Sequence, residues 1–470
     1  MKEKMKLTKL EKSWILYDIG NSAFILLVST LLPIYFNALA SGAGIGESDY
    51  LAYWGYAGSV ATILVAIIGP ICGTVADWNY KKPLFLGSLC LGAIGCAALG
   101  AAWSWLSFLV IFVIARVGYN ASIVFYDSML PEVTTEKRMD NVSTMGYALG
   151  YIGSVIPFAV CLVLVLMHDS FGMSQVTALI ISFVLTAAWW ILCSVPLAKR
   201  YKQTAFQVGG GKPIGESFKQ LARTFKEAKK HKHIFVYLIA FFFFIDGVYT
   251  IIDMATAYGT ALGLDTTGLL LALLVTQIVA FPFAILFGRL ASKYDTGLLI
   301  KICIACYTGI ALFAVFLATQ WQFWTLAVLV GMFQGGIQAL SRSYLGKIIP
   351  AEQSGEYYGL MDICGKGASF VGTTLVAVVS QATEGMSFSI FGIPVVNTGI
   401  AVGSIAVLFV IGFFLFCKAD KLNKARVTAE RIIPGANAPG ILQYIQLGSK
   451  FHLYPGYGVR ESEPLCTQKL

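Results

Sequence analysis

Long apolar stretches separated by short polar segments run along most of the chain. A transmembrane helix needs about 20 mostly apolar residues to cross the hydrocarbon core of a bilayer. Twelve suitable stretches cover approximately residues 15–39, 50–72, 83–103, 105–127, 143–166, 175–197, 234–258, 267–289, 298–319, 322–343, 357–380 and 393–417. The pattern predicts an all-α integral membrane protein with twelve transmembrane helices.

Lysine and arginine gather in alternate polar segments. The segments 40–49, 104, 167–174, 259–266, 320–321 and 381–392 contain neither residue, whereas the N-terminus, the intervening loops and the segment 418–431 contain nearly all of them. This asymmetry marks the cytoplasmic side of a membrane protein. It predicts that both termini are cytoplasmic, because a missed or extra helix would have reversed every later loop.

The composition excludes an ordinary soluble protein. Hydrophobic residues make up 57% of the 470 residues and charged residues 13%, with a mean hydropathy of +0.73, whereas soluble domains contain about 25% charged residues. The four histidines (His168, His231, His233 and His452) lie outside the predicted spans. A histidine-based metal or acid–base site within the membrane therefore has no candidates. Because no nucleotide-binding motif is present either, we predict no enzyme activity, no metal and no cofactor.

A long basic loop divides the chain into two halves. The predicted parts are a cytoplasmic N-terminus (1–14), a six-helix bundle (15–197), a cytoplasmic loop (198–233), a second six-helix bundle (234–417) and a cytoplasmic tail (418–470). Apolar residues at helical spacing among lysines and arginines within the loop fit either an amphipathic helix on the membrane surface or a solvated linker helix.

The two halves repeat at an offset of 215 residues. The offset aligns Gly73 with Gly288, Ser128 with Ser343, and Gly150 with Gly365. Two such repeats related by an axis along the membrane normal form a transporter architecture, in which the substrate site lies between the halves near the middle of the membrane.

Three charged residues lie near the middle of predicted spans. They are Arg116, Asp246 and Lys366. A charge at the bilayer centre costs several kcal/mol and therefore faces a cavity or a partner. We predict that Asp246 accepts a proton or binds a substrate amine, and that Arg116 and Lys366 hold a carboxylate or neutralise Asp246. The alternative is a structural ion-pair network that fastens the helices together.

Further polar residues accompany these charges on the same predicted helices. Asp362 lies one turn before Lys366, and Asn120 lies one turn after Arg116. Asp18 and Asn21 lie one turn apart near the cytoplasmic end of the first span. We include all four of these polar residues in the candidate substrate- and proton-binding set.

A second set of polar residues lies at the cytoplasmic ends of the predicted spans. Such residues are expected either to form a latch between the halves or to anchor helix ends at the membrane interface. The set consists of Gly73, Asp77, Lys81, Lys82, Asp127 and Arg342.

The pattern Gly73-x-x-x-Asp77-x-x-x-Lys81-Lys82 resembles the loop motif of the major facilitator superfamily, and Arg116 resembles its recurrent fourth-helix arginine. Segments 14–24, 244–252, 338–343 and 365–366 are similar to the Unknown Major Facilitator-1 group, which is related to the fungal vacuolar effluxer of autophagy, an amino-acid exporter. The similarity covers roughly residues 10–425. Ser292 departs from it, because the motif's second copy would have an aspartate there.

The resemblance implies a secondary transporter that works by alternating access, with an amino-acid-like solute and efflux as the expected direction. We add the hypothesis that Asp246 couples transport to protons. The alternatives are a facilitated uniporter and a non-transporting membrane receptor or scaffold. The expected partners are the solute, protons and the lipid bilayer, without nucleic acid, and the expected form is a monomer in a bacterial-type plasma membrane.

Overall fold

The computed structural model describes residues 6–45, 47–207, 231–383, 388–390 and 393–432. Within these ranges a few side chains, including that of Lys366, lie outside the description. One compact unit spans Met1–Asp420 and a second spans Lys421–Leu470.

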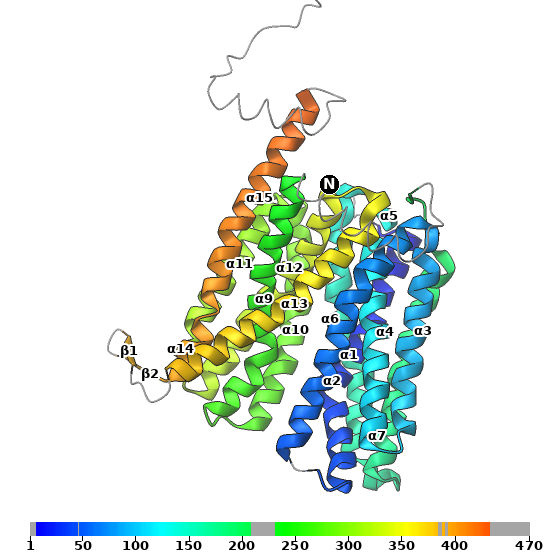
Figure 1. The fold of residues 1–470 in the computed structure, drawn as a ribbon, viewed down its shortest axis with the longest axis vertical. Coiled ribbons are helices and arrows are strands. Elements are labelled where there is room, and N and C mark those ends of the chain that lie inside the picture. Colours follow the sequence, from blue (N-terminus) through cyan, green and yellow to red (C-terminus); the bar gives the residue numbers. More distant parts are fainter. Residues whose placement is uncertain (1–5, 46, 208–230, 384–387, 391–392, 433–470) are drawn as a thin grey trace, which may run out of the picture. The chain divides into compact units, whose positions relative to one another are not determined.

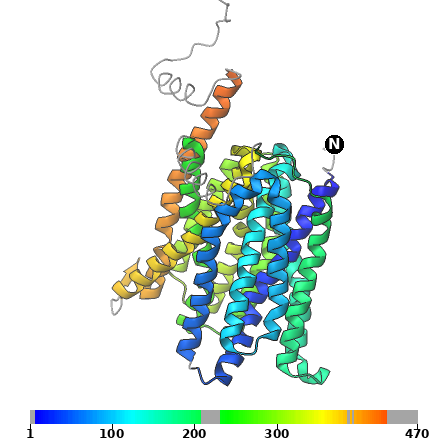
Figure 2. The same ribbon diagram turned by 45° about the vertical axis from the view of Figure 1, so that its right-hand side comes forward.

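The first half contains the helices α1 to α7, which are shown in Figures 1 and 2. Its helices are α1 (Lys9–Gly42), α2 (Glu47–Val75), α3 (Lys81–Ala98), α4 (Trp105–Ser128), α5 (Leu130–Val133), α6 (Glu136–Leu166) and α7 (Gln175–Arg200). Short single-turn helices cover Leu99–Ala101 and His168–Phe171.

The second half contains the elements from α9 to α15. They are α9 (Lys232–Ala261), α10 (Thr266–Ala291), α11 (Thr296–Ala314), α12 (Gln320–Ile348), a short turn of helix at Ala351–Gln353, α13 (Ser354–Ala382), β1 (Phe388–Ile390), β2 (Ile393–Val395), α14 (Asn397–Gly403) and α15 (Ala406–Ile432). The two strands form an antiparallel hairpin in which Phe388 pairs with Val395.

The predicted all-helical membrane fold is confirmed. Ten continuous helical segments of the described chain are long and apolar enough to cross a membrane; one of them, Tyr53–Ala101, contains both α2 and α3, and α13 contributes the shorter apolar helix Val371–Ala382. The prediction for the last span was wrong at its start, because residues 393–395 form β2 and the helix is interrupted between α14 and α15. The predicted amphipathic helix of the long loop falls on residues 208–230, outside the described residues.

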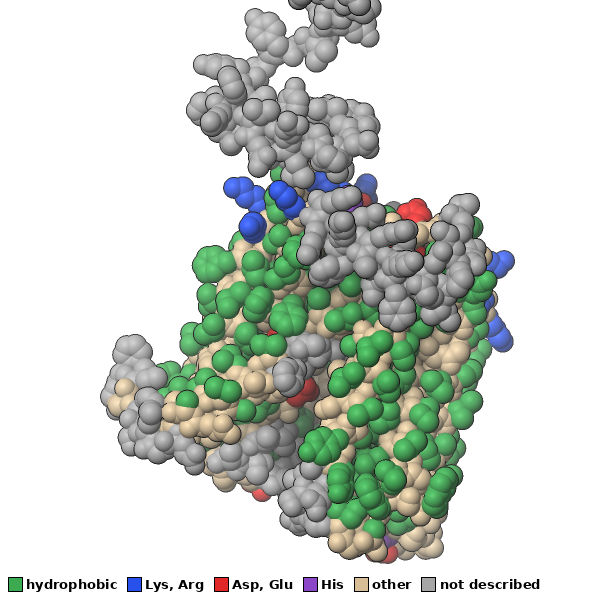
Figure 3. All heavy atoms as spheres, in the orientation of Figure 1, with side chains coloured by type: hydrophobic (Ala, Val, Ile, Leu, Met, Phe, Trp, Pro, Cys, Tyr) green, Lys and Arg blue, Asp and Glu red, His purple; other side chains and the backbone are tan. Residues whose placement is uncertain are grey.

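Each half has its own apolar core. One cluster of buried side chains lies between Trp14 and Tyr201, and the other lies between Ile234 and Ala419. Large apolar side chains such as Ile63, Leu192 and Phe414 remain exposed, and hydrophobic side chains cover much of the face seen in Figure 3. Exposed apolar surface of this extent is what contact with lipid requires.

The two halves pack against each other through a few helix pairs. Helix α2 and helix α4 contact α13, and α6 contacts both α10 and α12. The close approach of α2 and α13 depends on glycine, because a Cβ atom at Gly73 would collide with the backbone of Gly355.

Candidate functional site

Three clusters of polar side chains join the two halves at the end of the molecule where α1 begins. The first contains Asp77 and Lys81, the second Asp127 and Arg342, and the third Asp140 and Lys347. Two of these pairs belong to the set that the sequence predicts at the cytoplasmic helix ends.

Asp77 caps the first turn of α13 from the opposite half. Its Oδ1 accepts the N–H of Gly355 at 2.8 Å, and its Oδ2 accepts the N–H of Glu356 at 3.0 Å. These N–H groups have no partner within their own helix, and the positive end of the helix dipole favours a carboxylate there. Asp77 reaches this position because the chain turns at Ala76–Tyr80, where Asn79 has a φ of 70°. Asparagine tolerates that left-handed backbone conformation better than most residues do.

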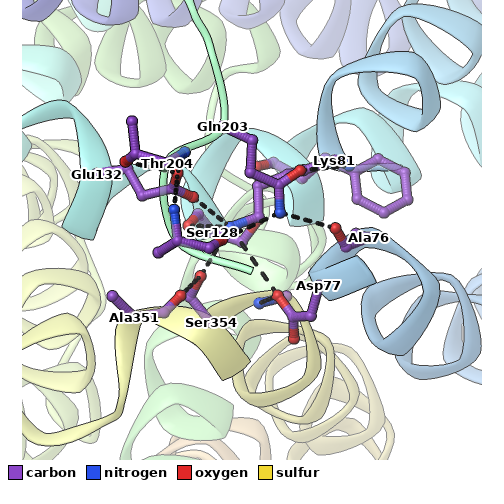
Figure 4. A network of polar contacts seen from close by, with 12 residues as sticks. Ala76, Asp77, Lys81, Ser128, Glu132, Gln203, Thr204, Ala351 and Ser354 are labelled. Carbon is purple, nitrogen blue, oxygen red and sulfur yellow. Dashed lines mark hydrogen bonds and ion pairs between the residues drawn. The ribbon is translucent and has the colours of Figure 1, made fainter. Parts of the chain in front are cut away.

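Lys81 lies completely buried beside Asp77 (Figure 4). Its Nζ donates to Oε1 of Glu132 at 2.6 Å, to Oγ of Ser354 at 2.9 Å and to the carbonyl of Ser128 at 3.3 Å. Ser354 belongs to the second half, so this ammonium group binds both halves together. Lys82, although adjacent, is only half-buried and makes no hydrogen bond or ion pair within the described residues.

Glu132 connects this cluster to the segment that follows α7. Its carboxylate accepts from the hydroxyl of Tyr201 at 2.9 Å and from the N–H groups of Thr204 at 2.6 Å and Ala205 at 3.1 Å. Burial, reinforced by the Glu132 charge, raises the pKa of Tyr201, so its hydroxyl stays protonated and donates. The beginning of the long loop is therefore attached to the same polar cluster.

Arg342 is the centre of the second cluster. Its Nη1 donates to Oδ1 of Asp127 at 2.9 Å, and its Nη2 lies 3.4 Å from Oδ2 of Asp18. Its Nε donates to Oγ of Ser143 at 2.9 Å, and its Nη2 donates to the Ser143 carbonyl at the same distance. Arg342 comes from α12, whereas all three partners come from the first half, so the guanidinium group joins α1, α4 and α6 to α12.

Aromatic rings surround this guanidinium group. Its carbon lies 4.6 Å from the ring of Trp14, 4.4 Å from Tyr147 and 5.5 Å from Tyr126. Such faces attract a cation and exclude water, which strengthens the charged contacts within. Asn21 lies beside Asp18, with its Nδ2 3.5 Å from Oδ1.

The third cluster is built around Asp140 on α6. Its Oδ1 accepts from Oγ of Ser343 at 2.6 Å, and its Oδ2 accepts from Oγ1 of Thr296 at 2.7 Å. Its Oδ2 also forms an ion pair with Nζ of Lys347. All three partners belong to the second half, so one carboxylate of the first half binds three side chains across the boundary.

The first and third clusters are equivalent under the offset of 215 residues. The equivalent pairs are Lys81 with Thr296, Ser128 with Ser343, and Glu132 with Lys347. In the first cluster both members of the ion pair, Lys81 and Glu132, come from the first half. In the third cluster the ammonium group comes from Lys347 of the second half, and the carboxylate comes from Asp140 of the first half. Sequence reasoning missed Glu132, Asp140, Ser143, Thr296 and Lys347, although the repeat offset applied to Lys81 and Glu132 would have pointed to Thr296 and Lys347.

The predicted mid-membrane residues do not form one cluster in the described part of the chain. Asp246 is completely buried between α9 and α13, where its Oδ1 accepts the N–H of Gly372 at 3.0 Å and the hydroxyl of Thr250 at 3.2 Å. Its Oδ2 is buried without a hydrogen-bond partner among the described residues. It makes no described contact with Arg116. The side chain of Lys366 lies outside the described residues.

The remaining predicted residues take separate places. Arg116 lies on α4 with its guanidinium 5.9 Å from the ring of Phe112. Asn120 is buried one turn further along α4 without a hydrogen bond to another described residue. Asp362 lies on α13, with its Oδ2 3.9 Å from where a Cβ of Gly69 would be. Within the described residues, no group of three or more His, Cys, Asp or Glu side chains is arranged to hold a metal ion.

Solved structures with a similar arrangement of helices show which fold this is. The chain is similar to the major facilitator superfamily transporter FucP in its outward conformation, with a TM-score of 0.64 and 16% identity over 87% of this chain and 97% of that one. It is also similar to a bacterial homologue of the iron transporter ferroportin in its outward-facing state, with a TM-score of 0.62 and 14% identity over 88% and 98% of the two chains. The fold is therefore that of the major facilitator transporters, a multi-pass membrane fold.

Sequence comparison gives the family. Residues 8–416 match the profile of the family described as vacuole effluxer Atg22 like, and the chain belongs to this family of transporters, which are not enzymes. It is 38% identical over 432 residues to the uncharacterized MFS-type transporter YxiO of Bacillus subtilis, covering 91% of this chain and 98% of that protein. It is 24% identical over 296 residues to autophagy-related protein 22-1 of Aspergillus fumigatus, covering 56% of this chain and 47% of the fungal protein.

Proposed function

We propose that the chain is a secondary transporter that moves a small, amino-acid-like solute by alternating access, coupled to protons. The supporting observation is where the halves are joined. The described hydrogen bonds between them lie at the end where α1 begins, and they are polar contacts that can break and re-form. Rocking of two repeats about a central site requires a reversible closure of this kind.

The proposed orientation has both termini in the cytoplasm of a bacterial cell. It rests on the concentration of lysine and arginine in the segments on that side. The end closed by the three clusters is then cytoplasmic, and the structure corresponds to a state open to the outside. FucP and the ferroportin homologue, whose folds this chain shares, were also captured in outward states.

Asp246 is the proposed proton carrier. Its Oδ2 is buried without a partner among the described residues, and this leaves one oxygen on which a proton can reside. Ionisable residues within membrane spans commonly serve as proton relays. Its contact with the N–H of Gly372 offers a way to transmit protonation to α13, which packs against α2 and α4 of the other half.

The solute class and the direction rest on the family. The description as an effluxer supports export, and the resemblance to an amino-acid exporter supports an amino-acid-like solute. A single chain contains both halves of the proposed transport unit, and we propose that it works as a monomer.

Proteoliposomes that contain a pH-sensitive dye test this proposal. Amino acids, short peptides and sugars are added one by one to the native chain, to Asp246→Asn, and to the control Asp169→Asn, whose carboxylate is exposed in the loop after α6. We expect a solute-dependent pH change in the native chain and the control that disappears in Asp246→Asn. Equilibration of labelled solute without a pH change would favour a uniporter. The absence of any flux would favour a receptor or scaffold.

A further inference from the structure

Two opposite charges face the space between the halves without partners. Arg116 lies on α4 of the first half, and its Nε is buried without a hydrogen-bond partner. Asp253 lies on α9 of the second half, and its carboxylate is exposed. Among the described residues, neither side chain forms a hydrogen bond or an ion pair, either with the other or with a third residue. Their charges nevertheless interact with each other electrostatically.

Helix geometry tilts the two side chains toward each other along the direction of the helix axes. Arg116 lies eleven residues before Asp127, which places it about 16 Å from the closed end along α4. Asp253 lies sixteen residues after Tyr237, whose hydroxyl binds the Ser341 carbonyl beside Arg342, and so lies about 24 Å from the same end along α9. The Cα–Cβ bonds of a helix tilt toward its N-terminus. Because α4 and α9 run in opposite directions, Arg116 leans away from the closed end and Asp253 leans toward it.

A tyrosine accompanies each charge on its own helix. Tyr119 lies one turn from Arg116 on α4, and Tyr249 lies one turn from Asp253 on α9, each on the side of the closed end. The ring of Tyr119 packs against Phe24 and Trp190 in the apolar core of the first half, so this tyrosine holds α4 in place beside Arg116. Figure 3 shows that the face is hollowed between the two groups of helices.

An unpaired guanidinium group within a membrane span is costly, so it is expected to have a partner for part of the working cycle. We propose that the partner is the transported solute: its carboxylate binds Arg116 and its protonated amine binds Asp253. This inference rests on the proposed transport function and adds Asp253 as a binding residue. A solute held in this way touches both halves at once, so its binding favours their closure around it.

Direct pairing of Arg116 with Asp253, when the open end closes, is the competing explanation. A direct pair would affect every solute alike, whereas a two-point site distinguishes solutes by their charges. Matched derivatives of one amino acid therefore separate the two explanations. An N-acetyl derivative lacks the cation, and a carboxamide derivative lacks the anion.

The experiment measures uptake into proteoliposomes of each radiolabelled L-amino acid that has an uncharged side chain, with competition by its N-acetyl and carboxamide derivatives. We expect both derivatives to compete at least tenfold more weakly than the parent amino acid in the native chain, because each loses one charged contact. In Asp253→Asn, the affinity for the amino acid falls about tenfold or more while that for the N-acetyl derivative is unchanged. In Arg116→Gln, the affinity for the amino acid falls about tenfold or more while that for the carboxamide derivative is unchanged.

An equal loss of affinity in Asp253→Asn for the amino acid, its N-acetyl derivative and its carboxamide derivative would overturn the proposed site. Thermal unfolding provides a second readout, because the two residues make no described hydrogen bond or ion pair whose loss would destabilise the fold. We expect unchanged or higher unfolding temperatures for both variants, and a fall of several degrees in both would assign them a structural role. Uptake of a sugar or an inorganic anion, without any amino acid, would overturn this site but leave transport standing. The absence of any flux would overturn both.

Discussion

Nη1 of Arg342 lies 2.9 Å from Oδ1 of Asp127, and the two residues are 215 positions apart in the chain. The same offset relates equivalent positions of the two halves. Two equivalent residues can touch only near the axis that relates the halves, so this ion pair lies close to that axis. A contact on the axis is well placed to hold the halves together at one end and to release them evenly.

Asp127 is expected to contribute more to this closure than Asp18 does. Its oxygen lies 2.9 Å from the guanidinium group, whereas that of Asp18 lies 3.4 Å away. Replacing Asp127 by Asn should lower the free energy of unfolding by about 1.5–3 kcal/mol, and the same change at Asp18 by less than about 1 kcal/mol. Unfolding of the detergent-solubilised protein measures both losses. A larger loss of unfolding free energy for Asp18→Asn than for Asp127→Asn would contradict this prediction.

Gly146 is required by the same ion-pair cluster. A Cβ there would lie 2.7 Å from Oδ2 of Asp18 and 3.2 Å from Nη2 of Arg342. Gly146→Ala should therefore destabilise the protein by about 1–3 kcal/mol, in the range of overpacked cores. Gly309→Ala is the matched control, because a Cβ there meets nothing within 4 Å and alanine favours the helix by about 0.5–1 kcal/mol. Equal unfolding temperatures for the two variants would rule out this steric role.

Lys81 and Lys82 offer an internal comparison between neighbours of the same type. Lys81→Met removes the partner of Glu132 and Ser354, and breaking a buried ion pair from one side costs about 3–5 kcal/mol. Lys82→Met removes a side chain that makes no described hydrogen bond or ion pair and should change stability by no more than about 0.5 kcal/mol. Thermal unfolding of both variants measures the difference, and similar losses would mean that Lys81 does not join the halves.

The Asp140–Lys347 pair is best tested by a double-mutant cycle. Asp140→Asn, Lys347→Met and the double variant are compared by the unfolding of the purified chain. Because the two side chains are in direct contact, the double variant should be more stable than the sum of the single losses predicts, by about 0.5–3 kcal/mol. Additive losses would show that the third cluster does not couple the halves.

The sequence was sufficient for the helices and for part of the polar network. Apolar stretches long enough to cross a bilayer identify the spans directly, and charges at their ends pointed to Asp77, Lys81, Asp127 and Arg342. Asp140, Thr296 and Lys347 were missed because their cluster takes its carboxylate from one half and its ammonium group from the other. Such a combination depends on tertiary packing: the repeat offset points to Thr296 and Lys347, but it does not point to Asp140.

Depth along a helix also proved an incomplete guide to proximity. Arg116 was expected to neutralise Asp246, or to hold a carboxylate, because both residues lie near the middle of a span. In the structure Asp246 binds the backbone of α13 within its own half, while Arg116 lies near the ring of Phe112 in the other half. Counting residues gives the height of a side chain in the membrane, but the packing of neighbouring helices decides which way it faces.

Hydrogen–deuterium exchange at the start of α13 tests most directly whether the Asp127–Arg342 pair holds this end closed. The N–H groups of Gly355 and Glu356 are bound by Asp77 only while the halves are together, so they report separation of the halves. Replacing Arg342 by Ala should increase exchange in the peptide containing these two residues by about tenfold or more, because about 1.4 kcal/mol of lost closure already gives that factor. Peptides from the core of α3 and from the exposed Gly309 region of α11 should remain unchanged. Unaltered exchange at Gly355 and Glu356 in Arg342→Ala would contradict the closure by this ion pair.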